Sequence, residues 1–86
     1  MIIDVREPFE FAGDHVTGAV NIPSQSLMSG VPELQGISTD TPLVVYCRSG
    51  SRSAIAARIF AQMGYTNIRN AINKEQVRGL IARGEL

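Results

Sequence analysis

The sequence predicts an α/β fold, a three-layer domain in which a parallel sheet of about four strands carries helices on both faces. Short, β-branched apolar segments alternate along the chain with segments of helical hydrophobic period. Strands that alternate with helices form crossover units, and these produce a parallel sheet covered on both sides. The length of 86 residues suits one domain, so we expect residues 1–86 to fold together.

The first third of the chain predicts two strands with a short helix between them. Residues 2–5 form a β-branched stretch that is typical of a buried strand. Pro8 suits the first position of a helix, and Gly13 suits its end. Residues 19–22 predict a second strand, which Pro23 closes because proline has no backbone N–H to donate.

The middle of the chain predicts one brief helix and a third strand. Ser24 and Ser26 are both candidate caps for a helix over residues 27–34, which Pro32 disfavours. The apolar residues 43–46 predict a fully buried third strand.

The last part of the chain predicts two helices around a fourth strand. Residues 51–63 show the clearest helical period, and Gly64 is a natural stop for that helix. Residues 67–70 predict a more polar strand. A last helix begins after Asn73, which resembles the start of a capping box. The partner of that cap is Gln76, and the expected inward residues of the helix are Val77, Leu80 and Ile81.

The composition argues against several classes of function. The formal net charge is zero, so there is no electrostatic reason to expect nucleic acid or an anionic membrane as a partner. A single cysteine cannot form an intramolecular disulfide. The charged residue Asp4 directly follows the apolar residues 1–3, so we expect neither a signal peptide nor a membrane span, and we expect a cytoplasmic protein.

Cys47 opens a loop between the third strand and the clearest helix. In parallel sheets, chemistry gathers where a strand ends and a helix begins. The backbone N–H groups of residues 48–52 can curl toward the sulfur, because Gly50 permits the dihedral angles of such a nest. The helix N-terminus and the cations Arg48 and Arg52 favour a negative charge at the same place. The pattern therefore predicts a reactive thiolate, although a lone cysteine after an apolar strand also fits a small buried hydrophobic residue.

The required stabilisation of the thiolate is modest. An ordinary cysteine has a pKa near 8.5, so only about 3% of it is thiolate at neutral pH. Lowering that pKa by two units requires about 2.7 kcal/mol in favour of the anion. The helix N-terminus contributes about 0.3 to 2 kcal/mol, and we expect the nest and the two arginines to supply the remainder.

Three blocks of sequence, the upstream one in two segments, resemble the rhodanese family of sulfurtransferases in their order and spacing. Residues 3–6 read Ile-Asp-Val-Arg, and residues 18–23 read Gly-Ala-Val-Asn-Ile-Pro. Residues 47–52 show the pattern Cys-x-x-Gly-x-Arg, and residues 63–68 read Met-Gly-Tyr-Thr-Asn-Ile. Together the blocks span most of the chain, which thus resembles a single-domain thiosulfate sulfurtransferase.

The resemblance implies a covalent sulfur transfer through Cys47. The thiolate attacks the outer sulfur of thiosulfate or of another sulfane-sulfur donor, and sulfite leaves. The resulting persulfide passes its outer sulfur to cyanide, to a thiol, or to a protein acceptor such as a thioredoxin-like protein. Neither a metal nor an organic cofactor is implied. The implied substrate-binding residues are Arg48, Ser49, Gly50, Ser51 and Arg52, and the residues implied to brace the loop are Asp4 and Arg6.

The chain departs from the family pattern at two places. Family domains usually begin with one more strand and helix, so we expect an open sheet edge at residues 67–70. Either a monomer or an edge-to-edge homodimer agrees with such an edge. Relatives often carry Gly-Gly after the last strand, where residues 71–73 read Ala-Ile-Asn here. This difference bears on access of the acceptor and leaves the nucleophile unaffected.

Two other functions remain open at this point. A phosphatase or arsenate reductase also uses a cysteine–arginine loop, but its pattern is Cys-x5-Arg, and Ser53 occupies that arginine position here. The alternative of a sulfur-relay or protein-binding module would keep Cys47 and turn over little free thiosulfate.

The remaining polar residues suggest supporting roles. His15 fits a histidine that bonds a loop backbone better than it fits a general base. Ser51 is equally a candidate donor to the sulfur and a candidate helix cap, and the other candidate donors are Ser49 and Ser53. The acidic residues expected on a solvated face are Glu7, Glu10 and Asp14, and the large apolar residues expected in the core are Phe9, Phe11, Met28, Phe60 and Met63.

Overall fold

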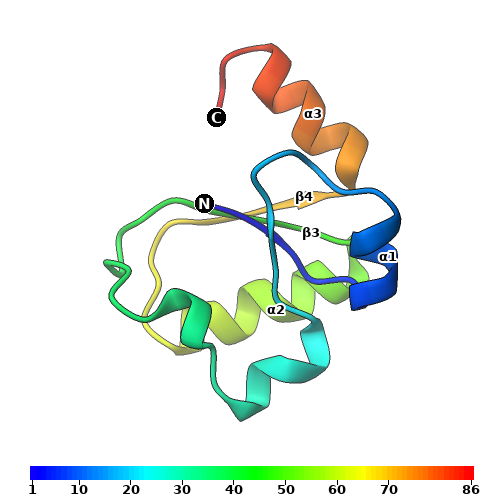
Figure 1. Ribbon diagram of the computed structural model, residues 1–86. Helices are drawn as coiled ribbons and strands as arrows, with labels where there is room; N and C mark the ends of the chain where they lie inside the picture. Colours follow the sequence, from blue (N-terminus) through cyan, green and yellow to red (C-terminus); the bar gives the residue numbers. More distant parts are fainter.

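The computed structural model describes residues 1–86 as a parallel four-stranded sheet with helices on both faces (Figure 1). Each neighbouring pair of strands is parallel. The predicted fold class is confirmed, and so is the position of the last strand at a sheet edge. The strands, in the spatial order β2-β1-β3-β4, are β1 (Ile2–Asp4), β2 (Val20–Asn21), β3 (Leu43–Tyr46) and β4 (Ile68–Ile72).

Three α-helices connect and cover the strands, and none of them has the length and apolarity needed to cross a bilayer. They are α1 (Pro8–Gly13), α2 (Ser51–Gln62) and α3 (Lys74–Ala82). The single helix expected over residues 27–34 is wrong. Two 3₁₀ helices, η1 (Ser24–Ser29) and η2 (Pro32–Leu34), stand there, because Gly30 at φ 100° ends the first and Pro32 can only begin the second.

The central strand β3 divides the core into two layers, since successive side chains of a strand point to opposite faces. Leu43, Val45 and Cys47 pack on the face covered by α2 and the two 3₁₀ helices. Val44 and Tyr46 pack on the other face, against Val77 and Leu80 of α3. In Figure 1, α2 and α3 accordingly lie on opposite sides of the strands.

Several large apolar residues that we expected inside lie at the surface. Phe60 is fully buried, as predicted, but Phe9 is 77% exposed and Met28 is 84% exposed. Helix α1 has six residues and buries none of them, so Phe9 has no layer to pack against. The other residues placed wrongly are Met63 and Ile81, which lie near the ends of α2 and α3 and are exposed, and Phe11, which is half-buried against His15.

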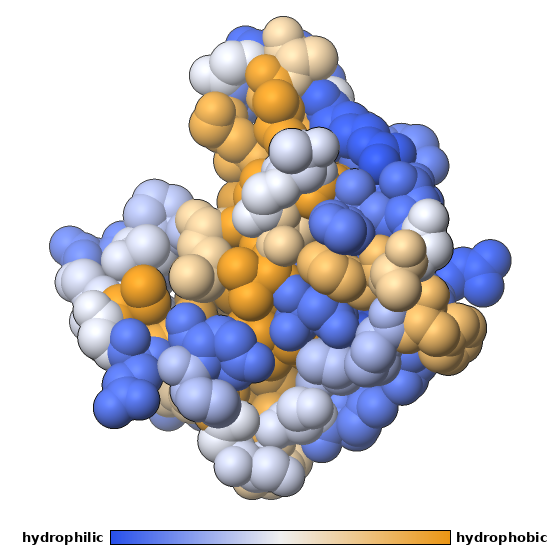
Figure 2. All heavy atoms as spheres, in the orientation of Figure 1, coloured by the Kyte–Doolittle hydropathy of each residue, from blue (hydrophilic) through white to orange (hydrophobic).

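The second face of the sheet is only partly covered. Helix α3 packs over β3 and β4, and a hollow of about 560 Å³ lies beside its C-terminal end. Figure 2 shows apolar atoms gathered in the hollow between the α3 lobe and the strands. The apolar residues that line the hollow are Met1, Ile2, Pro42, Val44 and Leu86.

Candidate active site

Cys47 directly follows β3, so it lies at the edge of the sheet where the carboxyl ends of the strands meet. It is 1% exposed, so its sulfur is recessed below the surface. A cavity of about 240 Å³ opens onto it. The cavity is polar, and Cys47 is the one apolar residue in its lining. The lining residues are Arg6, Cys47, Arg48, Asn73, Lys74 and Glu75.

The loop after Cys47 curls toward the sulfur, and of the N–H groups predicted to face it, over residues 48–52, those of Ser49 and Gly50 do so. Gly50 lies at φ 93°, in the left-handed region that glycine adopts freely, and caps the N-terminus of α2. Its backbone N–H donates to Cys47 Sγ at 3.0 Å. The hydroxyl of Ser53, one turn into α2, lies 3.4 Å from the same sulfur. Ser53 is fully buried, so this contact is shielded from water.

These contacts favour the thiolate. Burial opposes ionisation of the Cys47 thiol, but hydrogen bonds outweigh that effect and lower the pKa of Cys47 to about 7. At neutral pH about half of the thiol is therefore ionised, against about 3% for an ordinary cysteine. The donors are the Ser53 hydroxyl and the backbone N–H groups of Ser53, Gly50 and Ser49.

Asn70 is a site residue that the sequence pattern did not indicate. The pairing of β3 with β4 shifts register between Val45 and Tyr46, so β4 carries an irregularity at Asn70–Ala71. Such bulges re-aim side chains next to active sites. Here the Asn70 amide accepts from the Ser53 hydroxyl at 2.7 Å and donates to the Gly50 carbonyl at 3.2 Å. Only the tertiary pairing of β4 with the loop reveals this contact.

Ile72 follows the bulge in a strained conformation. Its φ of 75° is rare for a β-branched residue, and it is the only non-glycine residue with positive φ in the chain. The Ile72 carbonyl accepts from the Cys47 backbone N–H at 3.0 Å. Its side chain covers Gly50, because a Cβ placed on Gly50 would lie 3.2 Å from Ile72 Cγ2. The residues that replace Gly-Gly in this chain therefore pack directly on the loop.

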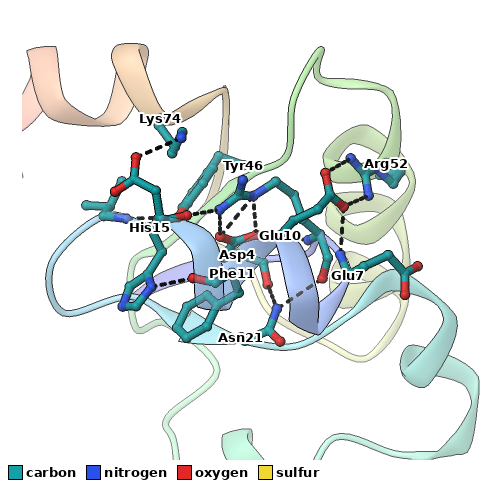
Figure 3. Close-up of polar contacts among 12 residues, drawn as sticks. Asp4, Glu7, Glu10, Phe11, His15, Asn21, Tyr46, Arg52 and Lys74 are labelled. Carbon is teal, nitrogen blue, oxygen red and sulfur yellow. Dashed lines mark hydrogen bonds and ion pairs between the residues drawn. The ribbon is translucent and has the colours of Figure 1, made fainter.

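Asp4 and Arg6 form a buried ion pair beneath the site (Figure 3). Arg6 Nη2 donates to Asp4 Oδ2 at 2.7 Å and to the Asp14 carbonyl at 2.6 Å. The hydrogen bond to Asp4, opposed by burial, raises the pKa of Arg6. Arg6 also lines the cavity, so it both supports the site and presents a positive charge to it.

The two arginines of the loop face different surroundings. Arg48 is exposed, lines the cavity and forms no ion pair. Arg52 does not line the cavity, because Glu10 of α1 holds its guanidinium at 2.7 Å (Figure 3). The Arg52 hydrogen bond lowers the pKa of Glu10 to about 2. The expectation that Glu10 belongs to a merely solvated face is wrong, since its side chain is 14% exposed.

The other predicted residues lie close to the loop or support it. The hydroxyls of Ser49 and Ser51 are exposed and lie 3.4 Å from each other, and Ser51 makes no capping bond. His15 Nδ1 bonds the Phe11 carbonyl at 2.7 Å, which confirms the backbone role expected for it. The Asn73 side chain caps α3, as predicted, by accepting from the Gln76 backbone N–H at 2.9 Å.

Lys74 adds a further charge that the sequence pattern did not indicate. It lies at the start of α3, lines the cavity and bonds Asp14 Oδ2 at 2.8 Å. The cavity therefore has cations from three directions, namely Arg6, Arg48 and Lys74, against the single carboxylate of Glu75. An anionic ligand of a few heavy atoms suits this charge and volume.

Comparisons with known proteins agree with this geometry. The sequence matches the rhodanese-like domain family over residues 1–73. It is 39% identical over 69 residues to the thiosulfate sulfurtransferase PspE of Escherichia coli, a match that covers 80% of this chain and 65% of that protein. It is 44% identical over 69 residues to the uncharacterized protein YqhL of Bacillus subtilis, covering 80% of this chain and 52% of that protein. The chain thus spans about half to two thirds of the length of these relatives.

Solved structures show the same fold. A rhodanese with anions from E. coli superimposes with a TM-score of 0.76 at 33% identity, and the match covers 87% of each chain. The human single-domain sulfurtransferase TSTD1 superimposes with a TM-score of 0.72 at 27% identity, covering 95% of this chain and 80% of the human protein.

Proposed function

Because this chain belongs to the rhodanese-like domain family, we propose that it is a sulfurtransferase that carries sulfane sulfur as a persulfide on Cys47. The donor is thiosulfate or a persulfide, and the acceptor is a thiol or cyanide. One observation carries the proposal: the Cys47 sulfur faces a cation-lined cavity and is ringed by hydrogen-bond donors.

The reaction proceeds in two balanced steps. The Cys47 thiolate forms a bond to the outer sulfur of thiosulfate, the sulfur–sulfur bond of the donor breaks, and sulfite leaves with the electron pair of that bond. An acceptor thiolate or cyanide then attacks the terminal sulfur and restores the Cys47 thiolate. The backbone N–H groups of the loop and the cations of the cavity also favour the anionic persulfide, whose terminal sulfur extends into the cavity.

The arrangement of charge supports binding of the donor in the cavity. Thiosulfate carries two negative charges, and Arg48 is the exposed cation beside Cys47 without a carboxylate partner. Arg6 and Lys74 add positive charge from the floor and from α3. Arg52, which is held by Glu10, acts by fixing α1 against α2 and by its charge.

A protein thiol, such as that of a thioredoxin-like protein, is the proposed cellular acceptor. The recessed sulfur and the exposed side chain of Ile72, 40% accessible at the rim, favour a partner that brings its thiol on a protruding loop. A relay module with slow turnover of free thiosulfate is the second candidate, and the same observation supports it. Comparing the rate of thiosulfate consumption with the rate of persulfide transfer to a reduced thioredoxin separates the two.

Intact-protein mass spectrometry tests the chemistry. Incubation with thiosulfate will add the mass of one sulfur atom, and cyanide will remove it and release thiocyanate. Cys47→Ala will take up no sulfur while its circular dichroism stays close to wild type, and its melting temperature will fall modestly because a buried sulfur that packs in the core is lost. Sulfur uptake by Cys47→Ala, or a wild-type mass that thiosulfate leaves unchanged, contradicts the proposal.

A further inference from the structure

The Ser53 hydroxyl has more acceptors around it than it has protons. Its oxygen lies 2.7 Å from Asn70 Oδ1, 3.2 Å from the Gly50 carbonyl and 3.4 Å from Cys47 Sγ. A serine hydroxyl carries one hydrogen, so it satisfies one of these acceptors at a time. Since Ser53 is fully buried, no bulk water substitutes for it.

Neither oxygen acceptor depends on that hydrogen. Asn70 Oδ1 also accepts from the Ile72 backbone N–H at 3.0 Å. The Gly50 carbonyl also accepts from the Ala54 backbone N–H at 2.9 Å and from Asn70 Nδ2 at 3.2 Å. These contacts also fix the orientation of the Asn70 amide, because its oxygen faces a donor and its nitrogen faces a carbonyl. The hydroxyl proton can therefore leave either oxygen without creating an unpaired buried group.

The hydrogen-bonding capacity of the sulfur, in contrast, changes during the reaction. A thiol can donate its own hydrogen to the Ser53 oxygen, and the Ser53 hydrogen then goes to Asn70. A thiolate has no hydrogen and can only accept. Once Cys47 is ionised, the arrangement of lowest energy has the Ser53 hydrogen on the sulfur, since hydrogen bonds to a charged group are stronger than those between neutral groups.

We propose that Ser53 is a catalytic residue whose hydroxyl turns from Asn70 to the Cys47 sulfur each time that the sulfur loses its proton, and that Asn70 is a positioning residue whose amide oxygen accepts the hydroxyl again when the sulfur no longer carries the charge. When the persulfide forms, the negative charge moves to the terminal sulfur and Sγ becomes a neutral divalent sulfur. The hydroxyl then returns to Asn70. This inference deepens the proposed sulfur transfer and depends on it only for the persulfide step, because ionisation of Cys47 can be measured without any donor.

The pH dependence of alkylation tests the role of Ser53. In wild type, the rate of reaction with iodoacetamide will rise through a pKa near 7 and level off above it. In Ser53→Ala the apparent pKa will rise by about one unit, which is about a tenfold lower alkylation rate at pH 6 with the rate at high pH unchanged. Ser38→Ala, which deletes a hydroxyl that bonds Asp40 far from the cysteine, will leave the curve in place. All of these variants keep the charged groups around the site, namely Arg6, Glu10, Arg48, Arg52, Lys74 and Glu75.

Nuclear magnetic resonance tests the turning of the hydroxyl itself. When the hydroxyl leaves Asn70, the Ile72 N–H becomes the remaining donor to Asn70 Oδ1, so its amide proton shift will titrate with the pKa found by alkylation. That titration will vanish in both Ser53→Ala and Cys47→Ala. An unchanged alkylation pKa in Ser53→Ala, or an Ile72 shift that does not follow pH in wild type, overturns the inference.

A second variant covers the case in which Ser53→Ala does not fold. Asn70→Asp lies on an edge strand and places a stronger acceptor against the hydroxyl, so it will raise the alkylation pKa by more than Asn67→Asp, which adds the same charge directly before β4. Equal shifts in the two variants overturn the inference. Failure of wild type to take up sulfur from thiosulfate, with these shifts intact, would overturn the proposed function alone.

Discussion

At the level of single residues, the site separates the residue that reacts from those that shape its surroundings. Cys47 is recessed, and its ionisation depends on hydrogen bonds from Ser53 and Gly50 that outweigh the burial of the sulfur. The two arginines of the loop make different contacts, because Arg48 lines the cavity and Arg52 pairs with Glu10. In the proposed function, arginine thus serves donor recognition at one position and structural support at the other.

The Arg52–Glu10 pair gives a prediction that double-mutant analysis can check. Arg52→Ala and Glu10→Gln will each lower the free energy of unfolding, and the two losses will not add, with a coupling of about 0.5 to 1 kcal/mol. Arg58→Ala, a change of the same kind at an exposed position of α2, will have little effect. Additive losses would show that the pair contributes nothing. The measurement is urea unfolding of the two single variants, the double variant and the control.

The pH dependence of this coupling follows from the lowered pKa of Glu10. Its folded-state pKa is about 2, below the ordinary value near 4.3. The stability contributed by the Arg52–Glu10 pair is therefore fully present above pH 4.3, and it is lost as the pH falls toward 2. Unfolding measured in wild type and in Glu10→Gln will accordingly differ at pH 6 and converge near pH 2.

At the level of elements, the loop between β3 and α2 depends on close packing against the end of β4. Gly50 has positive φ, and Ile72 fills the space that a side chain at position 50 would need. Both features hold the Gly50 N–H on the sulfur. The bulged strand β4 brings both Asn70 and Ile72 against that glycine, so the strand shapes the loop.

Gly50→Ala will show how far the loop depends on that packing. It will lower the free energy of unfolding by about 1 to 2 kcal/mol from backbone strain, with a further loss from the contact with Ile72. It will also raise the alkylation pKa of Cys47. Gly13→Ala meets nothing within 4 Å and has no positive φ, so it will be neutral or stabilising. Adding Ile72→Ala to Gly50→Ala will remove the crowded contact between the two side chains, so the stability lost through that contact will return. The backbone strain at position 50 will remain, so a full recovery of the free energy of unfolding would contradict this account.

The elements also show which features the sequence could predict. Local patterns placed β3, α2 and the Asn73 cap correctly, because apolar period and capping chemistry are properties of neighbouring residues. The bulge in β4 and the Ser53–Asn70 contact depend on register between strands, which no local pattern encodes. Phe9 and Met28 were misplaced for a related reason, since hydrophobicity alone does not say whether a covering layer exists.

At the level of the whole molecule, a small sheet with two thin core layers contains a buried ion pair. Asp4 is fully buried and Arg6 is 5% exposed, and together they connect the end of β1 to the segment that follows α1. A domain of this length has a free energy of unfolding of about 4 to 13 kcal/mol. One buried pair can therefore decide whether the chain is folded.

Asp4→Asn will test that dependence. The substitution leaves the buried Arg6 guanidinium without its carboxylate and will lower the free energy of unfolding by about 3 to 5 kcal/mol. Glu85→Gln removes a carboxylate from the exposed Arg83–Glu85 pair and will change the free energy of unfolding little. Chemical unfolding of both variants provides the comparison. Similar losses in the two variants would contradict the structural role assigned to Asp4.

The depth of the Cys47 sulfur has a consequence for labelling. A side chain that is 1% exposed admits only slim electrophiles, whereas a persulfide places a second sulfur about 2 Å further out along the opening. Bulky maleimide dyes will therefore mark the charged, sulfur-bearing form in preference to the resting form. In a mixture of the two forms, the size of the reagent therefore determines whether the thiol or the persulfide is labelled.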